Sequence, residues 1–143
     1  MHSISKEDLD MYFLELAKHY KRKNRKNLFP VELIVVGGAS ILLNYEFRYS
    51  TMDVDCLINI GSQLKESINY VSEKFSLPIN WINDDFKRTA SYSNKLIEYS
   101  IFYKSYLNII NVRTIKDEYL IAMKIIANRK YKNDLSDIIY RFF

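Results

Sequence analysis

Gly37-Gly38-Ala39-Ser40, followed after twelve residues by Asp53-Val54-Asp55, is the segment that constrains this 143-residue chain most strongly. The β-branched apolar run 31–36 leads into the glycine pair, so we predict a buried strand that stops at a sharp turn. Residues 40–47 form a short predicted helix, and residues 52–59 form a second predicted strand. The order strand, Gly-Gly-x-Ser, short helix, strand therefore organises the first half of the chain.

The two aspartates are the clearest chemical signal. Residues two apart on a strand point the same way, so Asp53 and Asp55 place two carboxylates on one face, opposite Val54, Cys56 and Ile58. Adjacent carboxylates repel each other unless a cation screens them. Mg²⁺ or Mn²⁺ provides that screening while it takes its other ligands from water and substrate phosphate. We therefore predict a divalent metal site at Asp53 and Asp55.

The glycine pair suits a phosphate site next to that metal. Gly37 and Gly38 permit positive φ and close approach of a phosphate to the backbone. A helix that begins near Ser40 would point free N–H groups and its positive dipole end at the phosphate, and the Ser40 hydroxyl would add a donor. Each motif alone is weak, because Gly-Gly is usually a turn and Asp-x-Asp is usually a surface or capping feature. Their combined order predicts a phosphate-plus-metal site.

The flanking patterns predict an α+β fold, with a small mixed β-sheet flanked by helices in one domain, residues 1–143. Before the central motif, a helix is predicted from the Ser5–Asp8 capping box to about Lys26. After it, the patterns predict a helix over 61–75, an irregular segment over 78–85, and strands over 96–102 and 106–112 joined by a tight turn at Lys104 and Ser105. The chain is predicted to end with a helix capped by Thr114 with Asp117 and a last helix from about Asn133.

Composition limits the classes of protein and of metal site. Apolar residues make up 48% and charged residues 27%, which is typical of a globular domain. No apolar run approaches the roughly 20 residues that cross a bilayer, and the N-terminus lacks a signal-peptide pattern, so we expect a cytoplasmic protein without a membrane segment. The single Cys56 excludes an internal disulfide, and His2 and His19 are too few for a zinc site. A catalytic metal must therefore be bound by oxygen.

The net charge of +4 is concentrated in the basic run 21–26. Basic residues suit the C-terminus of a helix, and no aromatic residue is interleaved there for base stacking. We interpret this run as a solvated helix end, with contact to a phosphate backbone as the alternative.

The central motif also resembles a known family signature. Gly37-Gly38-Ala39-Ser40, followed by Arg48-Tyr49-Ser50-Thr51-Met52-Asp53-Val54-Asp55, resembles that of the DNA polymerase β-like nucleotidyltransferase superfamily. It looks closest to the small bacterial branch that includes AbiEii-type toxins and DUF6036 domains. Residues 77–84 resemble the Trp-Leu-Asn-Asp segment of DUF6036 proteins, and residues 119–124, Arg129 and 134–138 resemble their C-terminal motif. The resemblance covers most of the chain in the expected order.

The resemblance implies a metal-dependent nucleotidyltransferase. In such enzymes a metal on the strand carboxylates orients the triphosphate of an NTP, an acceptor hydroxyl attacks the α-phosphorus, and pyrophosphate leaves. The implied catalytic and metal-binding residues are Asp53 and Asp55, and the implied nucleotide-binding residues are Gly37, Gly38, Ser40 and Lys124. Lys124 has the alternative interpretation of a lysine on a helix surface.

The acceptor and the partner are broader predictions from the same resemblance. The implied acceptor is an RNA, with a tRNA end as one option, or a protein, and the implied setting is a toxin–antitoxin pair with a cognate toxin or antitoxin. Active relatives usually carry a third carboxylate on a later strand, but residues 106–112 contain no acid, and Glu98 is the nearest candidate. Without a third acid the protein would bind nucleotide and transfer it slowly or not at all. The alternative is therefore a catalytically inactive binding module that acts as an antitoxin or regulator.

Overall fold

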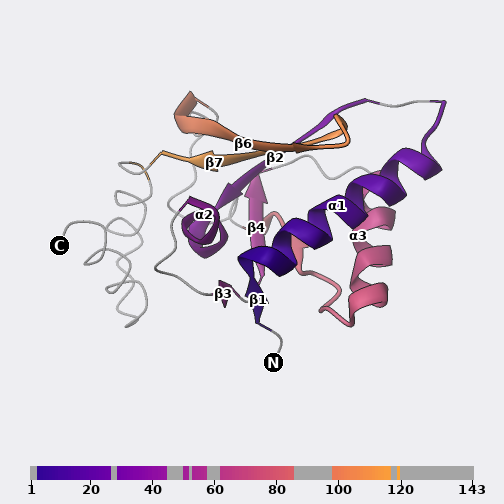
Figure 1. Ribbon diagram of the computed structural model, residues 1–143, viewed down its shortest axis with the longest axis horizontal. Helices are drawn as coiled ribbons and strands as arrows, with labels where there is room; N and C mark the ends of the chain where they lie inside the picture. The colour runs from indigo at the N-terminus through magenta and orange to yellow at the C-terminus, as the bar shows by residue number, and fades with distance from the viewer. Residues whose placement is uncertain are drawn as a thin grey trace.

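The computed structural model describes residues 3–26, 29–44, 50–51, 53–57, 62–85, 98–116 and 119 (Figure 1). The elements are β1 (Ile4–Ser5), α1 (Lys6–Lys23), β2 (Val31–Val36), α2 (Gly37–Asn44), β3 (Ser50–Thr51), β4 (Val54–Leu57), α3 (Ser62–Phe75), β5 (Ile82–Asn83), β6 (Ser100–Tyr106) and β7 (Ile110–Ile115). They confirm the predicted α+β class. Among the described helices, none is long and apolar enough to cross a bilayer.

Five strands form a mixed sheet in the order β5-β4-β2-β7-β6, and β1 pairs separately with β3. In the sheet, β2 runs antiparallel to β4 and parallel to β7, while β5 runs parallel to β4. Figure 1 shows α1 and α3 side by side, and their contact includes the rings of Tyr12 and Phe75, whose centroids are 4.9 Å apart. The central strand β2 is therefore bordered by β4, which carries Asp55, and by β7.

The two faces of the sheet have different surroundings. Leu33 and Val35 of β2, together with Val54 and Cys56 of β4, belong to the buried core that includes the apolar side of α1. Val36 points to the opposite face, because side chains alternate along a strand. Asp55 pairs with Val36 and so lies on that second face, away from α1. The predicted alternation is thus confirmed for Val54, Asp55 and Cys56, whereas Asp53 precedes the strand and Ile58 lies outside the described residues.

Trp81 fixes the chain after α3 beside β4. Its side chain is fully buried, and its indole N–H donates to the carbonyl of Ile68 at 3.1 Å. The Trp81 carbonyl accepts from the N–H of Val54 at 2.7 Å, at the point where β5 joins the sheet. Buried tryptophan is costly to misplace because it contributes a large apolar area and needs a partner for its N–H. The segment predicted as irregular therefore contains a short strand next to the aspartates.

Helix boundaries differ from the sequence-based expectation in two places. The predicted capping box at Ser5 is confirmed, since its hydroxyl accepts from the N–H of Asp8 at 3.1 Å. However, α1 ends at Lys23 rather than near Lys26, because both the backbone N–H and the side-chain amide of Asn24 bond to the carbonyl of Tyr20 and close the last turn. In addition, α2 begins at Gly37, three residues earlier than predicted.

The β6–β7 hairpin was also placed incorrectly from sequence. Its turn lies at 107–109 and not at Lys104 and Ser105, which belong to β6. Leu107 and Asn108 adopt φ values of 53° and 55°, so two non-glycine residues make a turn that carries no glycine signal. The predicted helix cap at Thr114 is wrong for a related reason, because β7 continues through it to Ile115.

Candidate functional site

Gly37 joins β2 directly to α2 and lies against one of the two aspartates. Its φ is +65°, in the left-handed region that glycine enters without strain. A Cβ at this position would lie 3.6 Å from Oδ2 of Asp55. The strand register explains the proximity, because Val36 immediately precedes the turn and pairs with Asp55. The glycine turn and one predicted metal ligand therefore meet at the end of β2.

The edge strand β5 brings two further polar residues to the same place. Asn83 pairs with Asp55 in parallel register, so both side chains lie on the face away from α1. The Asn83 side chain is buried; its Nδ2 donates to the carbonyl of Asn80 at 3.3 Å, and its Oδ1 accepts from the N–H of Asp85 at 3.1 Å. Asn83 thus fixes the backbone that carries Asp85.

The electrostatic surroundings of Asp53 connect these residues. Asp53 is partly exposed, but incomplete solvation still raises the pKa of its carboxyl. A hydrogen bond with the Asn83 side chain lowers this pKa, and the negative charge of Asp85 raises it further. A divalent cation would act in the opposite direction and favour the ionised carboxylate. The chain after β5 therefore brings the charge of Asp85 close enough to act on Asp53, and a cation would relieve this repulsion.

The donor set is suited to Mg²⁺ or Mn²⁺. The oxygens available come from Asp53 and Asp55, and these metals prefer hard oxygen ligands. Among the described residues, no group of three or more His, Cys, Asp or Glu side chains is arranged to hold a metal ion. Mg²⁺ is commonly bound by only one or two carboxylates, with water and substrate phosphate completing its shell. Asp53 and Asp55 would therefore hold such an ion together with a phosphorylated substrate.

A family model matches residues 8–142, nearly the whole chain, and its description is nucleotidyltransferase of unknown function (DUF6036). The chain belongs to the DUF6036 family. This match confirms the predicted nucleotidyltransferase-like family and agrees with the α+β architecture. Neither a curated protein nor a solved structure matches the chain significantly.

Within this DUF6036 fold, Glu98 does not complete the site. It immediately precedes β6, and β7 and β2 lie between β6 and β4. Three strand spacings of about 4.8 Å separate the outer strand from β4 by about 14 Å. That distance exceeds the reach of shared coordination, since two catalytic metal ions lie only about 4 Å apart. The strand order therefore contradicts Glu98 as the candidate for a third acid.

Asp85 is an acid near Asp53 that the sequence analysis did not single out. The negative charge of Asp85 acts on the carboxyl of Asp53. The preceding Asp84 instead acts on the buried Cys56, whose thiol pKa is raised mainly by burial and to a smaller extent by the charges of Asp55 and Asp84. The two adjacent acids therefore have different neighbours across the sheet. The only signal available from sequence was the resemblance of segment 77–84 to a family motif, and that segment stops one residue before Asp85.

Ser40 has a different environment from the one predicted. Its side chain is fully buried, and its Oγ accepts from the N–H of Ile115 at 3.1 Å. Asn44, one turn later, accepts from Oγ1 of Thr114 at 2.9 Å. These contacts attach α2 to the end of β7, so Ser40 holds the helix in place and does not face a phosphate. Lys124, the other predicted phosphate ligand, lies outside the described residues.

Replacing Ser40 by alanine should reduce the free energy of unfolding by about 1–2 kcal/mol, because the N–H of Ile115 would be left buried without its acceptor. Urea unfolding followed by circular dichroism measures this difference. Ser3→Ala is the matched control, since Ser3 is exposed and should change stability by less than about 0.5 kcal/mol. Equal stability of the two variants would contradict the structural role of Ser40.

Proposed function

We propose that this chain is a metal-dependent nucleotidyltransferase of the DNA polymerase β-like superfamily, related to its AbiEii-type branch. The observation that carries the proposal is the contact between the positive-φ turn at Gly37 and the carboxylate of Asp55, with 3.6 Å between Oδ2 and the position of a Cβ on the glycine. The positive φ favours glycine at this position, and glycine leaves the backbone beside the Asp55 carboxylate open to a phosphate. The DUF6036 description supports the same reaction class.

The chain's own groups have separate tasks in this proposal. The N–H groups at the start of α2 would bind the triphosphate of an NTP, because they have no partners within the helix and lie at its positive end. Asp53 and Asp55 would hold Mg²⁺ or Mn²⁺, which supplies charge neutralisation and orientation of the phosphates. Lys124 would add a positive charge to the triphosphate.

Asp85 is the group that we propose as the general base. An acceptor hydroxyl would form a bond to the α-phosphorus while the bond to the bridging oxygen breaks and pyrophosphate leaves. The hydroxyl proton would pass to the Asp85 carboxylate, which Asn83 positions beside Asp53.

The proposed acceptor is an RNA, with a tRNA end as one option, or a protein, and the proposed setting is a toxin–antitoxin pair in the cytoplasm. One observation favours a second function, an inactive module that binds nucleotide or a cognate partner. The strand next to β2, β7, has the sequence Ile-Asn-Val-Arg-Thr-Ile and carries no acid. In the active enzyme, the proton of the acceptor hydroxyl would then have to pass to Asp85, because β7 offers no acid for this step.

The direct experiment is to incubate the purified protein with each labelled NTP, Mg²⁺ or Mn²⁺, and total RNA or cell extract. The expected result is a labelled product that EDTA prevents. Ribonuclease and protease treatment of the product distinguish an RNA acceptor from a protein acceptor. Nucleotide binding without any product would favour the inactive module, and the lack of both binding and product would reject the enzyme and a module that binds nucleotide.

Gly38→Val should weaken NTP binding by about tenfold or more, because a β-branched side chain obstructs backbone approach to the phosphate. Stability should change by less than about 1 kcal/mol, since Gly38 lies inside α2 at a half-buried position and valine is a better helix former than glycine. Isothermal calorimetry with a non-hydrolysable NTP and Mg²⁺ measures the binding. Unchanged affinity in Gly38→Val, combined with lost affinity in Arg25→Ala, would move the nucleotide site to the basic end of α1.

A further inference from the structure

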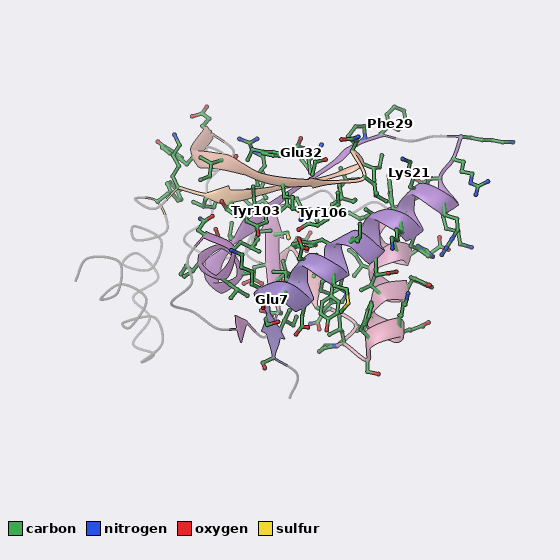
Figure 2. All side chains as sticks on the ribbon, viewed as in Figure 1. Glu7, Lys21, Phe29, Glu32, Tyr103 and Tyr106 are labelled. Atoms are coloured by element: carbon green, nitrogen blue, oxygen red, sulfur yellow. The ribbon has the colours of Figure 1, made fainter. Side chains whose placement is uncertain are left out.

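A groove with a basic lining lies at the C-terminal end of α1. It has a volume of about 540 Å³ and is lined by Lys18, Lys21, Arg22, Arg25 and Leu107. The four basic residues come from α1 and the turn after it, and Leu107 comes from the β6–β7 turn. Figure 2 labels Lys21 on this end of the helix. We call this surface the basic groove.

The positive charge of the basic groove is largely uncompensated. Lys18 has Glu15 within 3.7 Å, but Lys21, Arg22 and Arg25 form no ion pair with any carboxylate in the part of the chain that the structure describes. The guanidinium of Arg22 instead lies over the ring of Tyr70, 5.9 Å from its centroid. Uncompensated cations in a concave surface concentrate a positive potential there and attract a polyanion.

Two exposed apolar side chains lie near the β6–β7 turn: Leu107 lines the basic groove, whereas Phe29 lies outside that lining. Phe29 is 72% exposed and Leu107 is 40% exposed. The N–H of Val31 donates to the carbonyl of Ile109 at 2.7 Å, so the chain entering β2 runs beside the turn that carries Leu107, and Phe29 is two residues earlier. Figure 2 shows Phe29 and Lys21 at the same end of the molecule. An exposed aromatic ring next to a row of cations suits single-stranded nucleic acid, because unpaired bases stack while the backbone phosphates meet the cations.

The basic groove is separate from the proposed metal site. Val31, at the start of β2, is bonded to the turn beside the groove, whereas Val36, at the end of β2, pairs with Asp55. The five residue steps from Val31 to Val36, at about 3.3 Å each, place the two ends of β2 about 17 Å apart. A ligand of the groove is therefore distinct from the NTP.

We propose that the basic groove binds single-stranded RNA, with its cations on the phosphates and Phe29 against a base. The test is fluorescence anisotropy with a labelled single-stranded RNA of 12 nucleotides. Three or four phosphate contacts predict a slope of log K against log salt of about −2 to −3. Lys21→Glu/Arg25→Glu should weaken binding at least tenfold, and Phe29→Ala should weaken it about tenfold. The matched control is Lys65→Glu/Lys116→Glu, which changes the net charge equally at exposed sites outside the groove and should weaken binding less than threefold.

Several outcomes would overturn the proposal. Equal weakening in the groove and control variants would show attraction by net charge alone. Tighter binding of duplex RNA, of single-stranded DNA or of phosphatidylserine vesicles would assign the groove to another polyanion. Asp53→Asn/Asp55→Asn should bind RNA within twofold of the parent, whether or not the chain transfers nucleotides; a loss there would place the RNA at the metal site. If the charge-reversed protein does not fold, Lys21→Gln/Arg25→Gln should still lower affinity and reduce the salt slope by about 1.4.

Discussion

Replacement of both Asp53 and Asp55 by asparagine should abolish metal-dependent NTP binding and reduce nucleotide transfer by about 10³-fold or more. These two side chains supply the charged ligands proposed for the metal, and asparagine leaves a neutral oxygen that binds Mg²⁺ weakly. Calorimetry measures Mg²⁺ and NTP binding, and the labelled-NTP assay measures transfer. A folded double variant that binds both as tightly as the parent would disprove the site.

The stability of that variant separates a binding defect from unfolding. Incomplete solvation raises the pKa of the Asp53 carboxyl, and the negative charge of Asp85 adds to the rise, so the ionised form is disfavoured in the metal-free protein. Replacing the pair by neutral residues should leave the melting temperature equal or higher without metal, and should remove the increase that Mg²⁺ and NTP produce in the parent. Glu7→Gln/Glu73→Gln, at two exposed helix positions, provides the same charge change without loss of binding.

Asp85→Asn should reduce nucleotide transfer by about 10²-fold or more while NTP affinity stays within about tenfold of the parent. The reason is that a general base acts on the attacking hydroxyl and contributes little to binding of the nucleotide. Single-turnover kinetics at saturating NTP isolate the chemical step, and calorimetry gives the affinity.

Asp84→Asn is a closely matched control, because it makes the same chemical change one residue away. Asp84 acts on Cys56 and Asp85 acts on Asp53, so transfer in Asp84→Asn should remain within about threefold of the parent. Glu98→Gln should likewise be active, since three strand spacings separate β6 from β4. Equal loss in both aspartate variants, or full activity in Asp85→Asn, would remove Asp85 from the proposed mechanism.

Local patterns accounted for the features that sequence predicted correctly. The bounds of β2, residues 31–36, follow from a β-branched run with a glycine stop, and the start of α1 follows from the Ser5 capping box. The placement of Asp55 on the face opposite Val54 and Cys56 depends only on strand alternation, and the burial of Val54 and Cys56 agrees with it. These features need no information about distant partners.

The remainder depended on contacts between segments far apart in the chain. Asp85 lies near Asp53 because β5 pairs in parallel with β4, and Ser40 is buried because α2 meets β7. The hairpin turn at 107–109 uses non-glycine residues with positive φ, so neither composition nor periodicity indicated it. Glu98 was suggested from the alternation of residues along its own strand, which says nothing about the order of strands in the sheet. That order places β6 at the edge, three strands from β4.

The parallel pairing of β2 with β7 also governs the order in which the protein assembles. Val31 pairs with Ile110, so the centre of the sheet joins the first quarter of the chain to the last. During synthesis, β2 and β4 can form their antiparallel pair early. The other edge of β2 cannot form its hydrogen bonds with β7 until the ribosome has made β7, which ends at Ile115. Non-local pairing of this kind slows folding and leaves an unpaired strand edge available to other chains. A nascent or truncated chain that ends before β7 would therefore be prone to aggregation.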